Sequence, residues 1–564
     1  MIIGIDLGTT NSACAVWRDG QTETIPNGLG DTLTPSVVGI DDDGTVLVGQ
    51  AARQRLVSHP DRTVAFFKRL MGTSKMVSLG GSHQFTPVEL SSLVVRSLKE
   101  DAERYLGEPV AQAVISVPAY FNDLQRQATR DAAELAGLTV SRLINEPTAA
   151  AMAHGLHEAS EQRFMILDLG GGTFDVSIIE YFEGVIEVHA TAGDWSLGGE
   201  DFTEALLQYF VKESGIDNAQ LSAGDRQRLY ARIETFKRQF GGDRDSEIRF
   251  TLNDQDFALE VDTKEFEAAT ASLLRRLRVP MERSLKDANL RRDQLDDVVL
   301  VGGASRMQVF RSMVARLFGR LPRTDSDPDL TIVMGAAIQA GLASRDASLD
   351  DVVLTDVCPY SLGIAVVNQE SNAEDDLLFS PILERNTIVP VSKAEDFFTV
   401  ADKQKEIRVQ IFQGESRWVR NNVFMGDLSV KVPSAPAGEQ SIQVRFSYDA
   451  NALLAVDVEV KSTGKKISRV IESAAGRLTD AQKQASLKRL EKLKVLPRDR
   501  EEVRTVLARA DRVYASLLGD DRHHLSMALS AFEKTLQGQN PTEIERACRQ
   551  LNELLDEIDT DIWS

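Results

Sequence analysis

The most constraining feature of this sequence is a short pattern that occurs twice. Residues 1–12 read MIIGIDLGTTNS and residues 164–177 read FMILDLGGGTFDVS, so Asp168 stands in the second copy where Asp6 stands in the first. In both copies an apolar run, typical of a buried strand, ends in aspartate, leucine and glycine, with threonine close behind. The repetition predicts two similar halves, each with a strand that ends in an acidic, glycine-containing turn.

Both turns are suited to holding phosphate groups. Gly8 allows a ligand to approach the backbone closely, while Thr9 and Thr10 present N–H and hydroxyl donors. An aspartate such as Asp6 is stable beside phosphate oxygens only if a divalent cation and its waters separate them. One such turn is weak support, because many buried strands end in Asp-x-Gly. Two copies, together with a third strand–Gly–Gly element in LVGGASR (residues 300–306), favour a clamp that holds phosphates from two sides.

Charge and composition argue against several other classes. The chain has 564 residues, enough for about two to four domains. Its net charge of −21 argues against a general nucleic-acid or anionic-membrane binder, because attraction to phosphates requires an excess of lysine and arginine. The GxxxxGK[ST] pattern of ordinary P-loop ATPases is absent. Scattered single cysteines, and the lack of a leader pattern or a membrane-length apolar run, predict a cytoplasmic protein with no nucleic-acid partner and no membrane partner.

The pattern of apolar residues divides the chain into four regions. Residues 1–345 alternate strand-like runs with helical segments, which is typical of an α/β domain. Residues 346–355 form a linker that contains an apolar Val-Val-Leu run, so we expect this linker to dock on a neighbouring surface. Residues 356–472 alternate apolar and polar positions, which predicts a small antiparallel sheet domain. Residues 473–564 have a helical pattern.

Six longer segments resemble one known family. GIDLGTTNS, VISVPAYFND, INEPTAAA, DLGGGTFD, LGGEDF and LVGGASR have the order and spacing of the ATPase domain of the heat-shock protein 70 (DnaK-like) chaperones. The resemblance covers essentially the whole chain, and its compact length and short C-terminal end are most similar to the HscC-type branch. It implies a multidomain fold: an α/β actin-like ATPase domain of two lobes, then an antiparallel β-sandwich that binds peptides, then an α-helical lid.

The resemblance also implies a function. Members of this family bind extended apolar segments of unfolded polypeptides, and the binding and hydrolysis of ATP switch their affinity for these clients. A J-domain co-chaperone stimulates the hydrolysis, and a nucleotide exchange factor is a further partner of some members. The implied ligands are ATP or ADP with Mg²⁺, with K⁺ as an additional ion.

The family motifs assign nucleotide-site roles by position. Lys68 matches the lysine that positions the attacking water, and Glu146 matches an acid that helps to order metal and water. Asp6 and Asp168 are expected to hold Mg²⁺ through water, and Thr173 completes the catalytic set, which would place water and neutralise charge. The other implied nucleotide contacts are Gly8, Thr9, Thr10, Asn11, Gly170, Gly171, Gly172, Gly198, Gly199, Glu234, Lys237, Arg238, Gly302, Gly303, Arg306 and Asp329.

Two further sets of residues follow from the resemblance alone. A peptide channel in the sheet domain would be formed by Ile364, Val367, Phe398, Ala401, Ile407, Val409 and Tyr448. A relay from the nucleotide to the linker and its partners would use Pro118, Arg126, Arg142, Asp351, Val352, Val353, Leu354 and Asp356. Without the resemblance, the inward residues of alternating strands are equally well explained as ordinary core.

The chain departs from the family pattern at several positions. Gly241 replaces a common serine and Ala304 replaces a polar residue near the adenine, so we expect nucleotide affinity to fall roughly fivefold, since a neutral hydrogen bond contributes ~1 kcal/mol. Thr355 replaces a leucine of the linker, and Tyr448 replaces an aliphatic residue of the channel. The stretch between Lys68 and VISVPAY is shorter than is usual in the family.

Two other classes share the paired phosphate loops. A sugar-kinase-type enzyme would need a pocket for an acceptor hydroxyl and a catalytic base, and a filament-forming relative of actin would have a structural role. In both classes the residues after the linker would have no purpose. Phosphate release that an unfolded apolar peptide stimulates would distinguish a chaperone from both alternatives.

Overall fold

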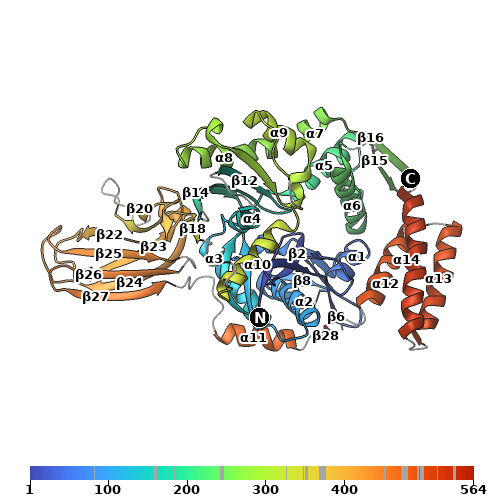
Figure 1. Cartoon of the computed structure of the whole chain (residues 1–564), viewed down its shortest axis with the longest axis horizontal. Helices are drawn as coiled ribbons and strands as arrows, with labels where there is room; N and C mark the ends of the chain where they lie inside the picture. Colours follow the sequence, from blue (N-terminus) through green and yellow to red (C-terminus); the bar gives the residue numbers. More distant parts are fainter. Residues whose placement is uncertain are drawn as a thin grey trace.

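The computed structural model shows a central body with a β-sandwich at one end and a bundle of helices at the other (Figure 1). The structure describes residues 1–81, 83–155, 162–182, 185–241, 247–253, 255–324, 327–346, 349, 353–367, 377–449, 453–471, 480–491, 494–495, 501–517, 519–537 and 541–563.

The first lobe of the central body is built on the sheet that contains the first copy of the repeat. Its β1 pairs in parallel with β10 and antiparallel with β2, so Asp6 lies at the carboxyl end of a central strand. The strands of this sheet, in order, are β11 (Thr139–Asn145), β10 (Gln112–Val117), β1 (Ile2–Asp6), β2 (Asn11–Arg18) and β3 (Gln21–Ile25), with β4 (Thr34–Pro35) beside β2. A small sheet and a hairpin complete the lobe: β5 (Val37–Ile40), β6 (Thr45–Val48), β7 (Thr63–Ala65), β8 (Val77–Leu79) and β9 (His83–Phe85).

The second lobe repeats this arrangement around the second copy. Here β12 pairs in parallel with β17 and antiparallel with β13, so Asp168 lies near the end of its strand just as Asp6 does. The strands of this sheet, in order, are β17 (Asp297–Val301), β12 (Gln162–Leu169), β13 (Phe174–Phe182), β14 (Val185–Asp194), β18 (Val353–Val357) and β21 (Ile388–Val389). The predicted strands and the predicted similarity of the two halves are confirmed.

Helices cover the sheets and fill the space between them. The α10 segment is apolar all round, as expected of a helix buried between two layers, and it packs with α4 in a core that combines residues of both lobes. The longer helices are α1 (Gln50–Ser58), α2 (Pro87–Leu106), α3 (Asp123–Leu135), α4 (Glu146–Gly155), α5 (Gly199–Glu213), α6 (Ala223–Gln239), α7 (Thr263–Ala269), α8 (Ala271–Asp287), α9 (Gln308–Phe318) and α10 (Thr331–Ala343). A hairpin of β15 (Glu247–Leu252) and β16 (Gln255–Glu260) follows α6.

The sheet domain is a sandwich of two four-stranded antiparallel sheets, as the period-two pattern predicted. Its core contains inward-facing residues of both sheets, with Phe446 fully buried at its centre. One sheet contains β20 (Leu378–Leu383), β19 (Leu362–Val366), β23 (Glu406–Gln413) and β24 (Val423–Lys431) in that order. The other contains β22 (Val391–Phe398), β25 (Ser441–Tyr448), β26 (Leu454–Val460) and β27 (Lys465–Ile471).

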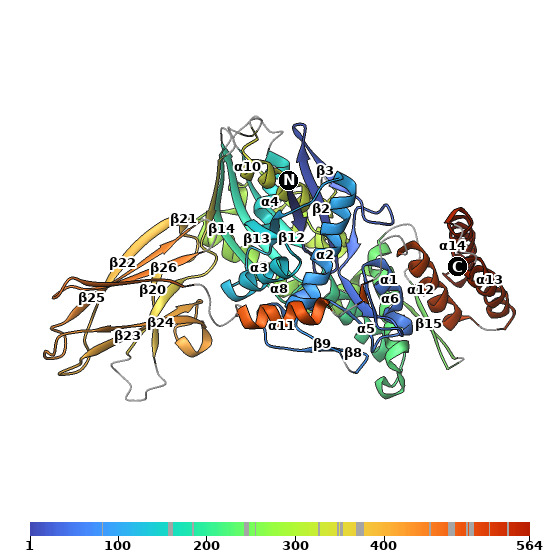
Figure 2. The same cartoon turned by 90° about the horizontal axis from the view of Figure 1, so that it is seen from below.

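The C-terminal helices do not cover the sandwich as the expected lid would: α11 and α12 lie on the first lobe, and α13 and α14 pack on α12 (Figure 2). Leu487 and Leu490 of α11 join the apolar core of that lobe, and β28 (Lys494–Val495) adds to its small sheet by pairing in parallel with β6. Next, α12 packs against α1, and Arg504 Nη1 lies 2.9 Å from Asp41 Oδ2. The C-terminal helices are α11 (Asp480–Glu491), α12 (Glu501–Ser516), α13 (Gly519–Gln537) and α14 (Pro541–Trp563).

The sandwich is joined to the second lobe through β18. This strand pairs in parallel with β14, so the expected boundary at residue 355 falls inside a strand that extends the sheet of the ATPase-like body. Three side chains reinforce the contact, because Asp287 of α8 accepts hydrogen bonds from Arg385 and Asn386 of the sandwich. The expected docking of the apolar linker is therefore what the structure contains, although Asp351 and Val352 lie outside the described residues.

Candidate functional site

The repeated turns face one another across a cavity of about 330 Å³ between the two lobes. Loops of both lobes line it, as the idea of a two-sided clamp predicted. The predicted residues among its lining are Asp6, Gly8, Thr9, Thr10, Asn11, Lys68, Glu146, Asp168, Gly170, Gly171, Thr173, Gly199, Glu234, Lys237, Arg238, Gly302, Gly303, Arg306 and Asp329. Gly172 and Gly198 lie just behind the lining, next to Thr9 and to Gly171 respectively.

Two aspartates form an acidic floor in this cavity. Asp6 Oδ1 accepts a hydrogen bond of 2.6 Å from Ser116, whereas Asp168 Oδ2 is buried with no hydrogen-bond partner among the described residues. Burial, and then the charge of Glu146, raise the pKa of Asp6 to about 6. The same two causes raise the pKa of Asp168 well above its usual range. The floor therefore holds buried carboxylates with too little positive charge around them.

The cation within reach of this floor is Lys68. Its Nζ lies 2.9 Å from Glu146 Oε1, and both side chains are almost fully buried, with 5% and 7% of their surface exposed. Lys68 belongs to the short 3₁₀ turn Phe67–Leu70 of the first lobe, whereas Glu146 begins α4. A buried lysine fixed by a carboxylate is a rigid donor, suited to orienting a water or an oxyanion in the cavity.

These residues fit a hydrated divalent cation with phosphate. The unpartnered Asp168 Oδ2 and the acceptor-only carboxylates need positive charge, and Mg²⁺ prefers oxygen ligands and keeps several waters. Among the described residues, no group of three His, Cys, Asp or Glu side chains could hold a metal ion directly. A cation here would therefore be held through its waters and through phosphate oxygens.

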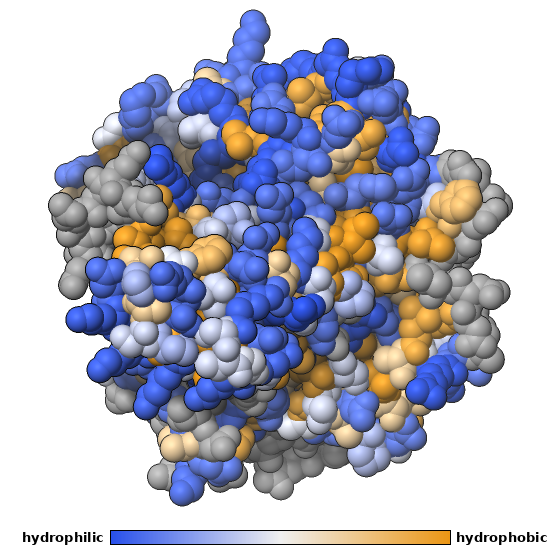
Figure 3. Space-filling view, turned by 90° about the vertical axis from the view of Figure 1, so that its left-hand side faces the viewer, coloured by the Kyte–Doolittle hydropathy of each residue, from blue (hydrophilic) through white to orange (hydrophobic). Residues whose placement is uncertain are grey.

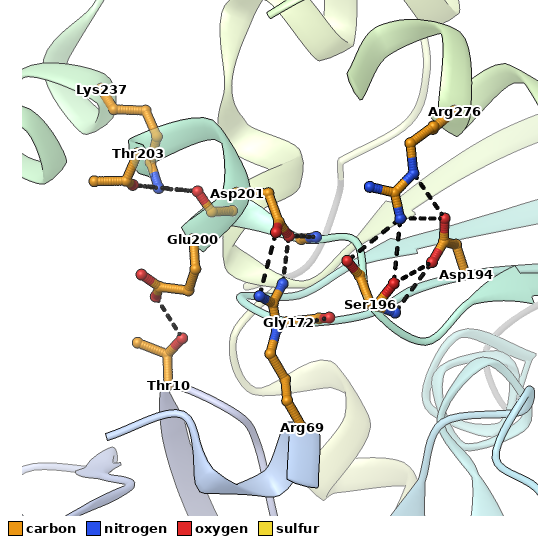
Figure 4. A network of polar contacts seen from close by, with 12 residues as sticks. Thr10, Arg69, Gly172, Asp194, Ser196, Glu200, Asp201, Thr203, Lys237 and Arg276 are labelled. Carbon is orange, nitrogen blue, oxygen red and sulfur yellow. Dashed lines mark hydrogen bonds and ion pairs between the residues drawn. The ribbon is translucent and has the colours of Figure 1, made fainter. Parts of the chain in front are cut away.

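Two polar bridges connect the lobes beside the cavity. Thr10 Oγ1 donates a 3.0 Å hydrogen bond to Glu200 Oε1, and Arg69 donates to both carboxylate oxygens of Asp201 (Figure 4). Arg69 Nε also donates to the backbone oxygen of Gly172, at 3.2 Å. Sequence reasoning did not find Glu200, Arg69 or Asp201. The available signals were the LGGEDF motif, which contains Glu200 and Asp201, and the position of Arg69 next to Lys68.

Glycines allow the backbone segments around the cavity to approach one another closely. A Cβ on Gly171 would lie 1.9 Å from Thr10 Oγ1, so any larger residue would push the two lobes apart. Gly302 has φ +79°, a conformation that other residues rarely adopt, and a Cβ there would lie 2.6 Å from Asp168 Oδ1. The cradle therefore depends on glycine at both positions.

The other end of the cavity is lined by paired charges. Glu234 Oε2 lies 2.5 Å from Lys237 Nζ, which also donates to the backbone oxygen of Gly199 at 2.8 Å. Arg238 Nε donates to Glu234 Oε1, and Arg306 pairs with Asp329 at 2.7 Å. All five charged residues come from the predicted set, and the structure brings them together from α6, from the 3₁₀ turn after β17 and from the loop before α10.

A comparison with protein-family models decides the family. The model described as Hsp70 protein matches residues 2–78 and 74–563 of the chain. The chain belongs to the Hsp70 protein family. The two matched segments overlap at residues 74–78. This overlap lies in the stretch after Lys68 that was expected to be shorter than in other members of the family.

Membership in the Hsp70 family indicates the general activity of the chain. Hsp70 proteins are ATP-dependent chaperones that bind ATP or ADP with Mg²⁺, and that bind unfolded clients and co-chaperones. The mixed α/β sheets and the attached helices fit a multidomain ATPase. No helix among the described residues has the length and apolar character required to span a membrane.

In this Hsp70 protein the described relay residues belong either to the first lobe or to β18, and hydrogen bonds connect the two groups. Arg126 Nη2 donates to Asn145 Oδ1 at 2.7 Å, and Asn145 Nδ2 donates to Asp356 Oδ2 at 2.7 Å. Asp356 and Arg142 line the same small cavity, of about 30 Å³, at the junction with the sandwich. Pro118 accepts a turn hydrogen bond from the N–H of Phe121 just before α3, Val353 belongs to β18, and Leu354 is partly buried against the core between the lobes.

The predicted peptide residues are not all brought together. The strand register places Ile364, Ile407 and Val409 on the inner side of the sandwich, whereas Phe398 is 59% exposed on the opposite face from its neighbour Phe397. Phe397 packs against the same core as Ile407. The other three predicted residues are Val367, half-exposed after β19, Ala401, exposed between β22 and β23, and Tyr448.

Tyr448 lies at the domain junction. Its side chain is buried, and its hydroxyl is 3.4 Å from Asp123 Oδ1 at the start of α3. Gln413 also meets Asp123, donating to Oδ1 at 3.3 Å and accepting from its backbone N–H at 3.1 Å. In the docked arrangement this tyrosine therefore contacts the ATPase domain instead of an open channel.

Proposed function

We propose that this Hsp70 protein hydrolyses ATP to ADP and phosphate in the cavity between Asp6 and Asp168, and that hydrolysis controls the binding of extended apolar polypeptides by the β-sandwich. The proposal includes stimulation by a J-domain co-chaperone, as the sequence resemblance implies. The observation that carries it is β18, because one strand is hydrogen-bonded into the sheet of the phosphate site and also begins the sandwich.

The residues of the cavity have different roles in the proposed hydrolysis. Lys68, fixed by Glu146, is placed to orient a water for attack on the terminal phosphoryl group. N–H and hydroxyl groups of the turns at Thr10 and Thr173 are placed to bind phosphate oxygens. Bound Mg²⁺ would neutralise charge on those oxygens. Glu234 and Lys237 are suited to the ribose hydroxyls.

Coupling is supported by two adjacent residues that face different partners. Glu146 binds Lys68 inside the cavity, while Asn145 donates to Asp356 in β18. A small displacement of the backbone at this point would move a contact of the catalytic lysine and a contact of the linker together. The contacts of Glu146 and Asn145 are therefore sufficient for the proposed coupling.

The client surface is proposed on the sandwich, around Phe397 and Ile407. Both are partly buried apolar residues at the edge of the sandwich core, next to the exposed Phe398 and Val400. Figure 3 shows this end of the molecule, where apolar patches interrupt a mainly hydrophilic surface. An extended apolar segment would bury its side chains there and use backbone hydrogen bonds for affinity.

The test is phosphate release by the full chain, with and without an unfolded apolar peptide. We expect the peptide to accelerate ATP hydrolysis. We expect Leu354→Asp to abolish this acceleration while leaving basal hydrolysis intact, because a charged side chain cannot replace the apolar contact that Leu354 of β18 makes with the core between the lobes. Leu321→Asp is the matched control, since Leu321 is 85% exposed. A peptide without effect on the unmodified chain would refute the proposal.

A further inference from the structure

The bridge between Thr10 and Glu200 includes a third side chain. Glu200 lies in the first turn of α5, in the second lobe, and its Oε1 accepts the hydrogen bond from Thr10 of the first lobe (Figure 4). Its other oxygen, Oε2, accepts a hydrogen bond from the hydroxyl of Tyr230 in α6. Hydroxyl groups therefore contact both oxygens of this buried carboxylate.

The hydroxyl of Tyr230 helps to keep Glu200 ionised. Burial, and then the charge of Glu234, raise the pKa of Glu200. The charge of Lys237 and the hydrogen bonds from Tyr230 and Thr10 lower this pKa. An ionised carboxylate is a stronger acceptor than a protonated one, so without the tyrosine hydroxyl Glu200 would hold Thr10 less firmly.

The ring of Tyr230 makes a second contact with the first lobe. Its centroid lies 6.3 Å from that of Phe66, with 50° between the ring planes, which is within the range of favourable aromatic pairs. Phe66 directly precedes the turn Phe67–Leu70, which carries Lys68, and it has φ +61°. A bulky residue rarely adopts this left-handed conformation, so contacts of its side chain are needed to hold it. The ring contact therefore stabilises the backbone from which the turn of Lys68 begins.

We propose that Tyr230 is a positioning residue for ATP hydrolysis, acting on Thr10 through its hydroxyl and on the turn of Lys68 through its ring. The inference rests on the proposed ATP site, although Tyr230 does not itself line the cavity. Thr10 is placed to bind phosphate oxygens before and during the reaction, so loss of the hydroxyl should weaken ATP binding. Lys68 is placed to orient the attacking water, so loss of the ring contact should slow the chemical step.

The experiment is single-turnover ATP hydrolysis by the full chain at several protein concentrations, because it gives the affinity for ATP and the rate at saturation separately. Tyr230→Phe keeps the ring and removes the hydroxyl, so we expect ATP affinity to fall about fivefold with little change in rate. Phe66→Leu removes the ring contact, so we expect the rate to fall about tenfold with little change in affinity. Phe66→Tyr keeps a ring at this position and should hydrolyse ATP at the unmodified rate.

Tyr209→Phe is the matched control, because Tyr209 of α5 packs on the core of the same lobe and does not line the cavity. Two results would overturn the inference while leaving the ATP site intact. One is unchanged ATP affinity in Tyr230→Phe or an unchanged rate in Phe66→Leu. The other is an equal loss of affinity and rate in both variants, since that would indicate a general disturbance of the fold. An unmodified chain that neither binds nor hydrolyses ATP would instead refute the ATP site itself, together with the inference.

Discussion

Asp287 is a suitable place to weaken the contact between the sandwich and the ATPase domain without touching the cavity. Its carboxylate accepts 2.8 Å hydrogen bonds from Nε and Nη2 of Arg385 and one of 3.0 Å from Asn386. The hydrogen bonds from Arg385 hold the pKa of Asp287 below its usual range, so the group is ionised at neutral pH. In Asp287→Ala all three bonds are lost.

The expected cost follows from the number of bonds and their exposure. Hydrogen bonds to charged groups contribute ~1.5–3 kcal/mol each, but the Arg385 side chain is 32% exposed and water replaces part of the loss. We expect Asp287→Ala to cost about 2 kcal/mol of docking free energy. This corresponds to a roughly 30-fold lower equilibrium constant for docking of the sandwich on the ATPase domain. Two-state switches are commonly biased by energies of this size.

The assay is hydrogen exchange of the backbone amides of Val353–Val357 in the presence of ATP. These amides are protected when β18 pairs with β14, so protection should fall by a factor approaching 30 in Asp287→Ala. Asp457→Ala is the matched control, because Asp457 pairs with Lys466 within the sandwich alone. Equal protection of β18 in both variants and in the unmodified chain would refute the reasoning.

Three further predictions concern the cavity, the helices and pH. Lys68→Ala should slow single-turnover ATP hydrolysis by about 100-fold or more while ADP still binds in calorimetry, and normal hydrolysis would remove the lysine from the mechanism. Arg504→Glu should release α12 from the first lobe, because it places like charge beside Asp41; an unchanged distance between fluorescent labels on α12 and α1 would contradict this. Burial in the docked state raises the pKa of Asp123 from 3.8 to about 6, so the docked state favours the protonated carboxyl. Docking should therefore be strongest below pH ~4 and weaken by up to ~3 kcal/mol as pH rises to ~6, and Asp123→Asn should remove this dependence of interdomain energy transfer.

Local patterns were sufficient to predict the two turns that line the cavity. Asp6 and Asp168 each end an apolar strand, and the glycines and threonines that follow them are neighbours in the chain, so the geometry of each turn is encoded within a few residues. The pairing of the two turns across the cavity followed from their repetition. By contrast, Arg69 and Asp201 meet only because the lobes are close, and no local pattern predicts such a long-range ion pair.

The sandwich shows a different limit of sequence reasoning. Phe397 and Phe398 are adjacent, and only the register of β22 against β25 decides which of them faces inward. The position of Tyr448 depends on docking against Asp123, a contact between domains that strand periodicity does not encode. The strand β28, which pairs with β6, was likewise not predicted, because the helical pattern of residues 473–564 gives no sign of a strand.

The C-terminal helices are held by two contacts that differ in how much they depend on charge. The contact of α11 combines the apolar Leu487 and Leu490 with ion pairs from Lys483 to Asp131 and Glu134, whereas α12 meets the first lobe through ion pairs from Arg504 to Asp41 and Asp43. Dissolved salt screens the ion pairs but leaves the apolar part of the α11 contact in place. Rising ionic strength would therefore lift the distal bundle while α11 stays seated, so the C-terminal segment would open as a hinged flap in two stages rather than detach at once.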